Sequence, residues 1–136
     1  MEYDLSGKWY VLYSTFPMWL KGDKKNPSFH YGTPANGRFS DTVEYEQKGT
    51  IKKIEGTDTI QGTTFIWRGK FIKSRWEILY YNPKDGTAII HFDKTLFTPE
   101  GYDVISREKT IHPTIEKELF IHLHDLGIKD KLIKIQ

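Results

Sequence analysis

The stretch Gly7-Lys8-Trp9-Tyr10-Val11-Leu12-Tyr13 carries large apolar or aromatic side chains at five successive positions. Because successive side chains of a β-strand point to opposite faces, Trp9, Val11 and Tyr13 share one face and the two residues between them share the other. A strand that is apolar on both faces has to be covered on both. We therefore expect one face to line a closed interior and the other to be covered from outside.

Turn signals rich in glycine, proline and asparagine divide most of the remaining chain into short segments of strand character. The expected strands are Trp9–Thr15, Ser28–Tyr31, Phe39–Glu46, Thr50–Ile60, Thr63–Ile72, Arg75–Tyr81, Thr87–Thr95 and Tyr102–Arg107. Consecutive strands with short connections are antiparallel neighbours, and eight of them close most easily into an up-and-down barrel, which removes exposed sheet edges. A barrel of this size has room inside for side chains or for one small ligand.

One helix is expected from Pro113 to Leu126, because proline suits the first turn and Gly127 supplies a left-handed stop. Its apolar residues form a single stripe, consisting of Ile115, Leu119, Leu123 and Leu126. One stripe indicates that the helix packs on the outside of a sheet. Residues Lys131–Ile135 are predicted to form a short final strand. The sequence thus predicts a single all-β domain over residues 1–136: an eight-stranded antiparallel up-and-down barrel, one C-terminal helix outside it and a last strand.

The connection Met18–Pro27 is long for a hairpin, and it begins apolar and ends basic. Loops of this length are often lids over a binding site. The alternative is a loop that buries Trp19 and Leu20 in the nearby core. In either case we expect Met18–Leu20 near the open mouth of the barrel.

Composition excludes several classes of protein. The chain of 136 residues is 15% aromatic, which favours a β-rich fold, and its formal net charge of +2 is too small to indicate a nucleic-acid partner. It contains no cysteine, so disulfides, thiol catalysis and cysteine-bound metals are excluded. There is no apolar run long enough to form an integral membrane segment. Glu2 and Asp4 stand where a signal peptide would become apolar, so the sequence as printed predicts a cytoplasmic protein, or a periplasmic or secreted one if a leader was removed.

Two segments resemble a known family. Gly7-Lys8-Trp9-Tyr10 resembles the N-terminal Gly-x-Trp motif of the lipocalins, within the calycin superfamily. Val104-Ile105-Ser106-Arg107, with the helix and final strand that follow, resembles the end of bacterial and apolipoprotein-D-like lipocalins. The resemblance implies that Gly7 and Trp9 belong to the structural motif, that Trp9 fills the closed end of the barrel and that Arg107 packs across it. It also implies a small hydrophobic ligand.

The sequence departs from this family in two places. The family's Thr-Asp-Tyr-like turn between the sixth and seventh strands is not evident in Tyr81–Gly86, and its common disulfide is absent. These departures leave the identity of the ligand open.

The candidate ligand-binding residues are aromatic and polar groups expected on the barrel walls, since a pocket of aromatics with a few polar groups is the general form of a small-molecule site. They are Tyr13, Trp19, Tyr31, Tyr45, Phe65, Trp67, Trp76, Tyr80 and His91. No cofactor, metal or catalytic residue is predicted. His122 and His124 are two residues apart on a helix and therefore face different sides, which does not suit a shared metal.

The favoured function is binding of a small hydrophobic molecule inside the barrel, for storage, transport or sensing. One alternative is an isomerase or cyclase on the same barrel, which would need an inward acid or base such as His91, Glu77 or Tyr80. A second is an interaction module whose barrel is filled by its own aromatics. A stacking surface for nucleic acid is disfavoured, because alternation separates the aromatics of residues 65–70 from the basic residues. The oligomeric state is left open.

Overall fold

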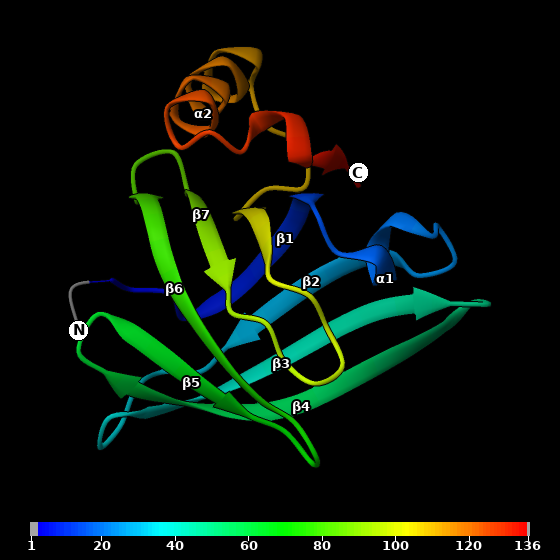
Figure 1. The fold of residues 1–136 in the computed structure, drawn as a ribbon, viewed down its shortest axis with the longest axis vertical. Helices are drawn as coiled ribbons and strands as arrows, with labels where there is room; N and C mark the ends of the chain where they lie inside the picture. The colour runs from blue at the N-terminus through cyan, green and yellow to red at the C-terminus, as the bar shows by residue number, and fades with distance from the viewer. Residues whose placement is uncertain (1–2, 136) are drawn as a thin grey trace.

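Eight antiparallel strands form a closed barrel in the computed structural model, which describes residues 3–135 (Figure 1). The elements in chain order are β1 (Gly7–Ser14), α1 (Pro17–Leu20), β2 (Lys25–Tyr31), β3 (Arg38–Gln47), β4 (Thr50–Gln61), β5 (Thr64–Arg68), β6 (Lys73–Asn82), β7 (Thr87–Phe92), β8 (Gly101–Ser106), α2 (Pro113–Asp125), η1 (Lys129–Lys131) and β9 (Ile133–Lys134). Each strand from β2 to β8 pairs with the next, and β1 closes the ring by pairing with both β8 and β2. The short β9 adds to β1 outside the ring. The predicted fold class is confirmed.

Several predicted boundaries need correction. Strand β5 ends at Arg68, because Gly69 opens a turn in which its N–H donates to the Ile72 carbonyl. Strand β7 ends at Phe92, since the Thr95 hydroxyl accepts from two following N–H groups and makes a side-chain turn. Strand β2 begins earlier than expected, at Lys25. After β5 and β7, local hydrogen bonds within the connection take the place of the inter-strand hydrogen bonds that the apolar sequence pattern had predicted.

Strands β1 and β6 each carry an irregularity that the sequence pattern did not reveal. The register of β1 against β8 shifts between Val11 and Tyr13, and that of β6 against β7 shifts between Ile78 and Tyr80. Each shift inserts one extra residue, so two consecutive side chains lie on the outer face of the barrel. Both bulges lie beneath α2, where they enlarge the apolar surface that the helix covers.

Helix α2 packs on the outer wall of the barrel, as predicted (Figure 1). Leu119 and Leu123 are each only 1% exposed and pack in one apolar cluster with residues of β1, β7 and β8. The predicted stripe is wrong at Leu126, which caps the helix and is exposed. The chain then turns through Gly127, and the buried Ile128 donates its N–H to the Leu123 carbonyl. Within residues 3–135 there is no helix of the length and apolar character needed to cross a membrane.

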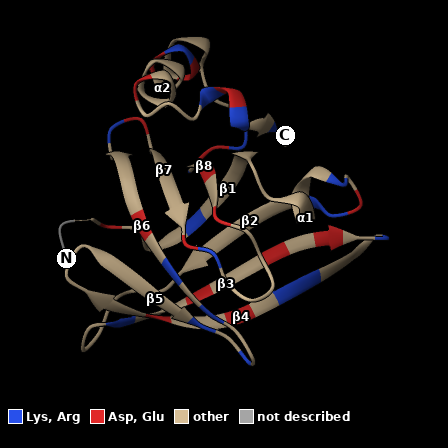
Figure 2. Ribbon diagram, viewed as in Figure 1, with Lys and Arg blue, Asp and Glu red and all other residues tan. Residues whose placement is uncertain are grey.

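The outer faces of the strands carry charges of both signs. Figure 2 shows acidic and basic residues interspersed along β3 and β4, where Glu44 lies opposite Lys53 in the register. Inward positions of the same strands include the apolar residues Phe39 and Val43. This alternation fixes which face of each strand borders the interior.

One end of the barrel is closed by Trp9, which is 1% exposed. The Arg107 guanidinium carbon lies 4.1 Å from the centre of the Trp9 ring system, and Arg107 donates hydrogen bonds to the carbonyls of Ser6 and Asp4. The Trp9 indole N–H donates to the Leu5 carbonyl at 2.8 Å. The segment before β1 is thereby held across the end of the barrel. Gly7 has a φ of 104°, and a Cβ at this position would lie 3.1 Å from an Arg107 nitrogen, so glycine suits the close approach.

Replacing Leu119 with alanine is expected to lower the free energy of unfolding by about 2–5 kcal/mol, because it leaves a cavity between α2 and the barrel. Urea denaturation measures the change. Ile121→Ala is the matched control on the same helix, since Ile121 is 55% exposed and should change stability by less than about 0.5 kcal/mol. Equal losses in the two variants would contradict the packing described here.

Replacing Trp9 with alanine is expected to cost about 3–5 kcal/mol, the range for deleting a buried large aromatic side chain. Thermal and urea denaturation would both report the loss. Lys109→Ala, at an exposed position beyond the same end, serves as a control. A loss below about 1 kcal/mol for Trp9→Ala would mean that the closed end does not depend on this side chain.

Candidate functional site

A cavity of about 170 Å³ lies inside the barrel, toward the end opposite Trp9. We call this end the mouth; α1 and the β5–β6 and β7–β8 connections all contribute to the cavity lining there. The lining is mostly apolar and consists of Phe16, Met18, Trp19, Phe29, Tyr31, Asp41, Val43, Ile54, Trp67, Ile72, Ser74, Phe92, Thr95, Thr98 and Asp103. A concave, mainly apolar space with a few polar groups is suited to a small molecule.

Trp19 reaches the cavity from α1, a helical turn that the sequence analysis had treated as part of a loop. Proline at the first position of this turn costs no hydrogen bond, which explains why Phe16-Pro17 both stops β1 and starts a helix. Trp19 is buried and packs edge to face on Tyr45, with the ring centres 5.7 Å apart. Leu20 is exposed. The expectation that this segment buries its apolar side chains therefore holds for Trp19 and is wrong for Leu20.

Trp67 lines the same cavity from β5 and lies flat against the wall. Its indole N–H donates to the Asp41 carbonyl at 3.0 Å. A Cβ added at Gly56 or Gly69 would come within 2.3 or 2.4 Å of the indole. The two glycines therefore provide the space that the indole occupies.

An aromatic stack fills the interior beside the cavity. Phe65 and Trp76 are stacked with their ring centres 4.3 Å apart, and Tyr31 stacks on Trp76 at 5.7 Å. Tyr31 also lines the cavity, whereas Phe65 and Trp76 do not. Of the predicted ligand-binding residues, Trp19, Tyr31 and Trp67 are thus brought together at the cavity. Whether they bind a ligand stays a prediction.

Three predicted site residues lie on the outside of the barrel, and their expected place at the interior is corrected here. Tyr13 and Tyr80 follow the two bulges and therefore pack beneath α2. The Tyr13 hydroxyl donates to Glu116 at 2.6 Å, and the Tyr80 ring lies 4.0 Å from the ring of His122. The third residue is His91, whose neighbours on β7 both face the interior.

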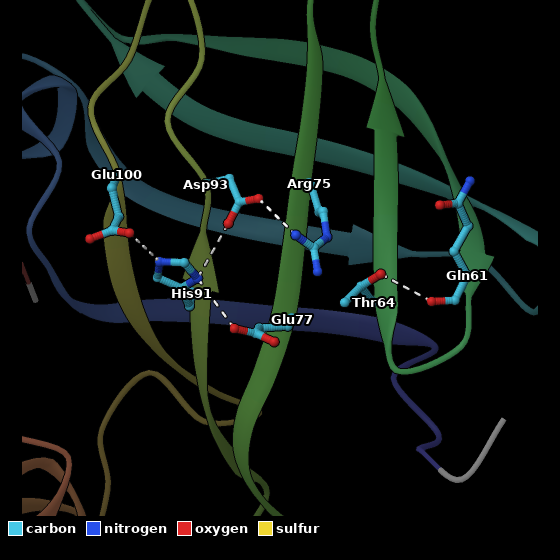
Figure 3. Close-up of polar contacts among 7 residues, drawn as sticks. All are labelled: Gln61, Thr64, Arg75, Glu77, His91, Asp93 and Glu100. Carbon is cyan, nitrogen blue, oxygen red and sulfur yellow. Dashed lines mark hydrogen bonds and ion pairs between the residues drawn. The ribbon is translucent and has the colours of Figure 1, made fainter.

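His91 belongs to a polar cluster on the outer wall (Figure 3). Its Nε2 lies 3.0 Å from Glu100, and its Nδ1 lies 3.5 Å from Glu77 and 3.7 Å from Asp93. Arg75 lies 3.3 Å from Asp93 and continues the cluster. Among residues 3–135, no group of three or more histidine, aspartate or glutamate side chains has an arrangement that could hold a metal ion. The cluster therefore joins β6, β7 and the start of β8 on the surface, away from the cavity.

The sequence analysis missed three buried aspartates on the inner face. Asp41, Asp58 and Asp103 are 6%, 0% and 1% exposed. Each occupies an inward position beside an apolar inward residue of its own strand, as in Phe39-x-Asp41-x-Val43. The available signal was an aspartate at the same alternation as the apolar side chains of its strand.

Burial dominates the acidity of these groups. It raises the pKa of Asp103 to about 7, and a hydrogen bond from Ser14 opposes the rise. Burial also raises the pKa of Asp41 well above its usual range, and the hydrogen bond and charge of Asp58 raise it further. The pKa of Asp58 is raised by burial as well, although Trp76 donates to its Oδ1 at 2.9 Å. The carboxyls of Asp41 and Asp58 therefore influence each other's acidity.

Several solved structures resemble this chain over most of its length. Insecticyanin from the tobacco hornworm Manduca sexta has a TM-score of 0.77 and 14% identity, with coverage of 99% of this chain and 81% of that one. Lobster apocrustacyanin A1 has a TM-score of 0.73 and 14% identity, covering 95% and 75% of the two chains. The siderocalin Ex-FABP, described as functioning through dual ligand specificities, has a TM-score of 0.72 and 16% identity, covering 93% and 90%. At these identities the likeness concerns the fold.

Comparison with known sequences finds less similarity than comparison with solved structures does. No protein-family profile matches the chain. Phosphoribosylaminoimidazole-succinocarboxamide synthase A of Bradyrhizobium diazoefficiens is 32% identical over 69 residues, which is 49% of this chain and 27% of that enzyme. The chain thus matches about a quarter of the length of this curated relative, and the activity of the whole enzyme is not assigned to it.

The raised pKa of Asp103 predicts a pH dependence of stability. An aspartate has a pKa of about 3.9 in the unfolded chain, so between about pH 4 and pH 7 the folded state binds more protons at Asp103 than the unfolded state does. Stability from this group is therefore full below about pH 4 and falls as the pH rises to about 7, by up to about 4 kcal/mol. Asp103→Asn removes this contribution. Urea denaturation from pH 4 to pH 8 should show a smaller loss for the variant, and identical pH profiles would contradict the assignment.

Proposed function

We propose that this chain, which has the lipocalin fold, binds a small, mainly apolar molecule inside its barrel. The observation that carries the proposal is the cavity between Trp9 and the mouth, because its walls offer aromatic surface to a ligand on several sides. Removing apolar surface from water yields about 25 cal/mol per Å². A ligand enclosed by such walls gains this energy without any new covalent or metal interaction.

The cavity volume limits the size of the enclosed part of the ligand. At about 170 Å³ it is close to the ~150 Å³ of an engineered apolar cavity that binds benzene. One ring with a short substituent therefore fits inside. A longer ligand extends past Trp19 and the β7–β8 connection into the mouth.

This space favours binding over an interaction module, because a module with a filled barrel needs no internal cavity. The acid or base groups considered from the sequence for an enzyme, His91, Glu77 and Tyr80, lie on the outer wall and do not support that alternative.

The apolar dye N-phenyl-1-naphthylamine tests the proposal. We expect about one dye per chain, with increased dye fluorescence and quenched tryptophan emission, because two tryptophans line the cavity. At roughly 0.3 kcal/mol per heavy atom, a dye of this size binds with a Kd of about 0.1 mM. Fluorescence titration measures both stoichiometry and affinity. If no dye binds, the alternative of an interaction module with a filled barrel is favoured instead.

Variants on the inner and outer sides of the barrel distinguish a dye bound in the cavity from a dye bound on the outer surface. Trp67→Ala should change the dye affinity severalfold, because it removes part of the cavity wall. Lys70→Ala, at an exposed position in the β5–β6 turn, and Tyr80→Phe, beneath α2, should leave the affinity within a factor of two. Weakened binding in the two controls with an unaffected Trp67→Ala would place the dye on the outer surface.

A further inference from the structure

The three inward aspartates each lie next to an apolar inward residue of the same strand, namely Phe39 and Val43 for Asp41, Ile60 for Asp58 and Ile105 for Asp103. Asp41 and Asp103 line the cavity, and Asp58 is buried next to Asp41. All three carboxyls act electrostatically on the buried side chain of Tyr31, which also lines the cavity. They are therefore gathered in one region of the interior, although they come from β3, β4 and β8.

No cation offsets these carboxyls in the part of the chain that the structure describes. The ion pairs within residues 3–135 include none of the three. No lysine, arginine or histidine side chain lines the cavity. A buried carboxylate without a counter-charge is strongly unfavourable, so this arrangement favours any ligand that supplies one.

Two buried carboxylate oxygens, Asp58 Oδ2 and Asp103 Oδ1, also lack a hydrogen-bond partner among the described residues. Asp58 accepts from the Trp76 indole at its Oδ1, and its carboxyl interacts with that of Asp41. Asp103 receives a hydrogen bond from Ser14, but its Oδ1 is buried and has no partner among the described residues. Natural proteins leave few such atoms unpaired, and those that remain often belong to binding sites.

The rest of the cavity is suited to an aromatic ring. Trp19, Phe29 and Phe92 line it together, and the rings of Phe29 and Phe92 lie 6.3 Å apart. Aromatic faces attract cations as well as apolar groups. The volume of about 170 Å³ fits one ring with a short chain.

We propose that the cavity selects small aromatic amines, with the ammonium group held by Asp103 and Asp41 and the ring packed among Trp19, Phe29 and Phe92. This inference rests on the proposed function and names the class of its ligand. The ammonium donates to the unpaired Asp103 oxygen and supplies the missing positive charge. The aromatic wall accounts for the remainder of the ligand.

Phenethylamine and 2-phenylethanol provide a matched pair of probes, since they have the same shape and differ in the charged group. Displacement of N-phenyl-1-naphthylamine at pH 8 measures both affinities on the intact chain. We expect the amine to bind at least tenfold more tightly than the alcohol. Asp103→Asn should reduce this preference to within twofold, and Asp93→Asn, on the outer wall, should retain it.

The outcomes separate the two proposals. If dye binds but the alcohol displaces it as well as the amine does, the amine inference is overturned and the apolar binding function stands. If no dye binds, the proposed function itself fails. If Asp103→Asn keeps the preference for the amine, the inference is overturned for Asp103. The ratio of amine to alcohol affinity in Asp41→Asn then tests Asp41, the other carboxyl that lines the cavity. Should Asp103→Asn not fold, the wild-type ratio and Asp41→Asn still decide.

Discussion

The stack of the Arg107 guanidinium on Trp9 is the contact on which the closed end of the barrel depends. It joins the end of β8 to the start of β1, and the hydrogen bonds from Arg107 to Ser6 and Asp4 hold the preceding segment across the opening. The Trp9 indole and its own bond to Leu5 fill the space behind it. Because one end is filled by Trp9 and its neighbours, the unfilled volume lies toward the mouth.

Strand β1 has to serve two layers at once, the barrel interior and the surface beneath α2. Strict alternation gives each layer every second side chain. The bulges in β1 and β6 relax this rule by turning one additional residue outward, so that Tyr13 and Tyr80 join the cluster under Leu119 and Leu123. The helix thereby gains apolar surface without removing Trp9 or Val11 from the interior.

The buried aspartates conflict with the apolar character of the strands that carry them. Conflicts of this kind between local pattern and burial are expected where a protein binds a ligand, because stability there is exchanged for function. Here the cost is visible as the raised pKa values of Asp41, Asp58 and Asp103, each caused first by burial. Aromatic walls surround these carboxyls, and in the proposed function the walls set the shape of the ligand and the carboxyls its charge.

The sequence by itself determined the barrel and the outer helix, because short-range periodicity, turn residues and helix ends are local signals. The roles expected of Trp9 and Arg107 came from the resemblance of two segments to the lipocalins. The sequence also placed Trp19, Tyr31 and Trp67 among the candidates that meet at the cavity. Only the tertiary structure decided that Tyr13, Tyr80 and His91 lie outside, since a bulge or a strand's phase depends on pairing with a neighbour. The same holds for the three aspartates. Pairing of β3 with β4 brings Asp41 close to Asp58, and closure of the barrel brings Asp103 of β8 into the same interior.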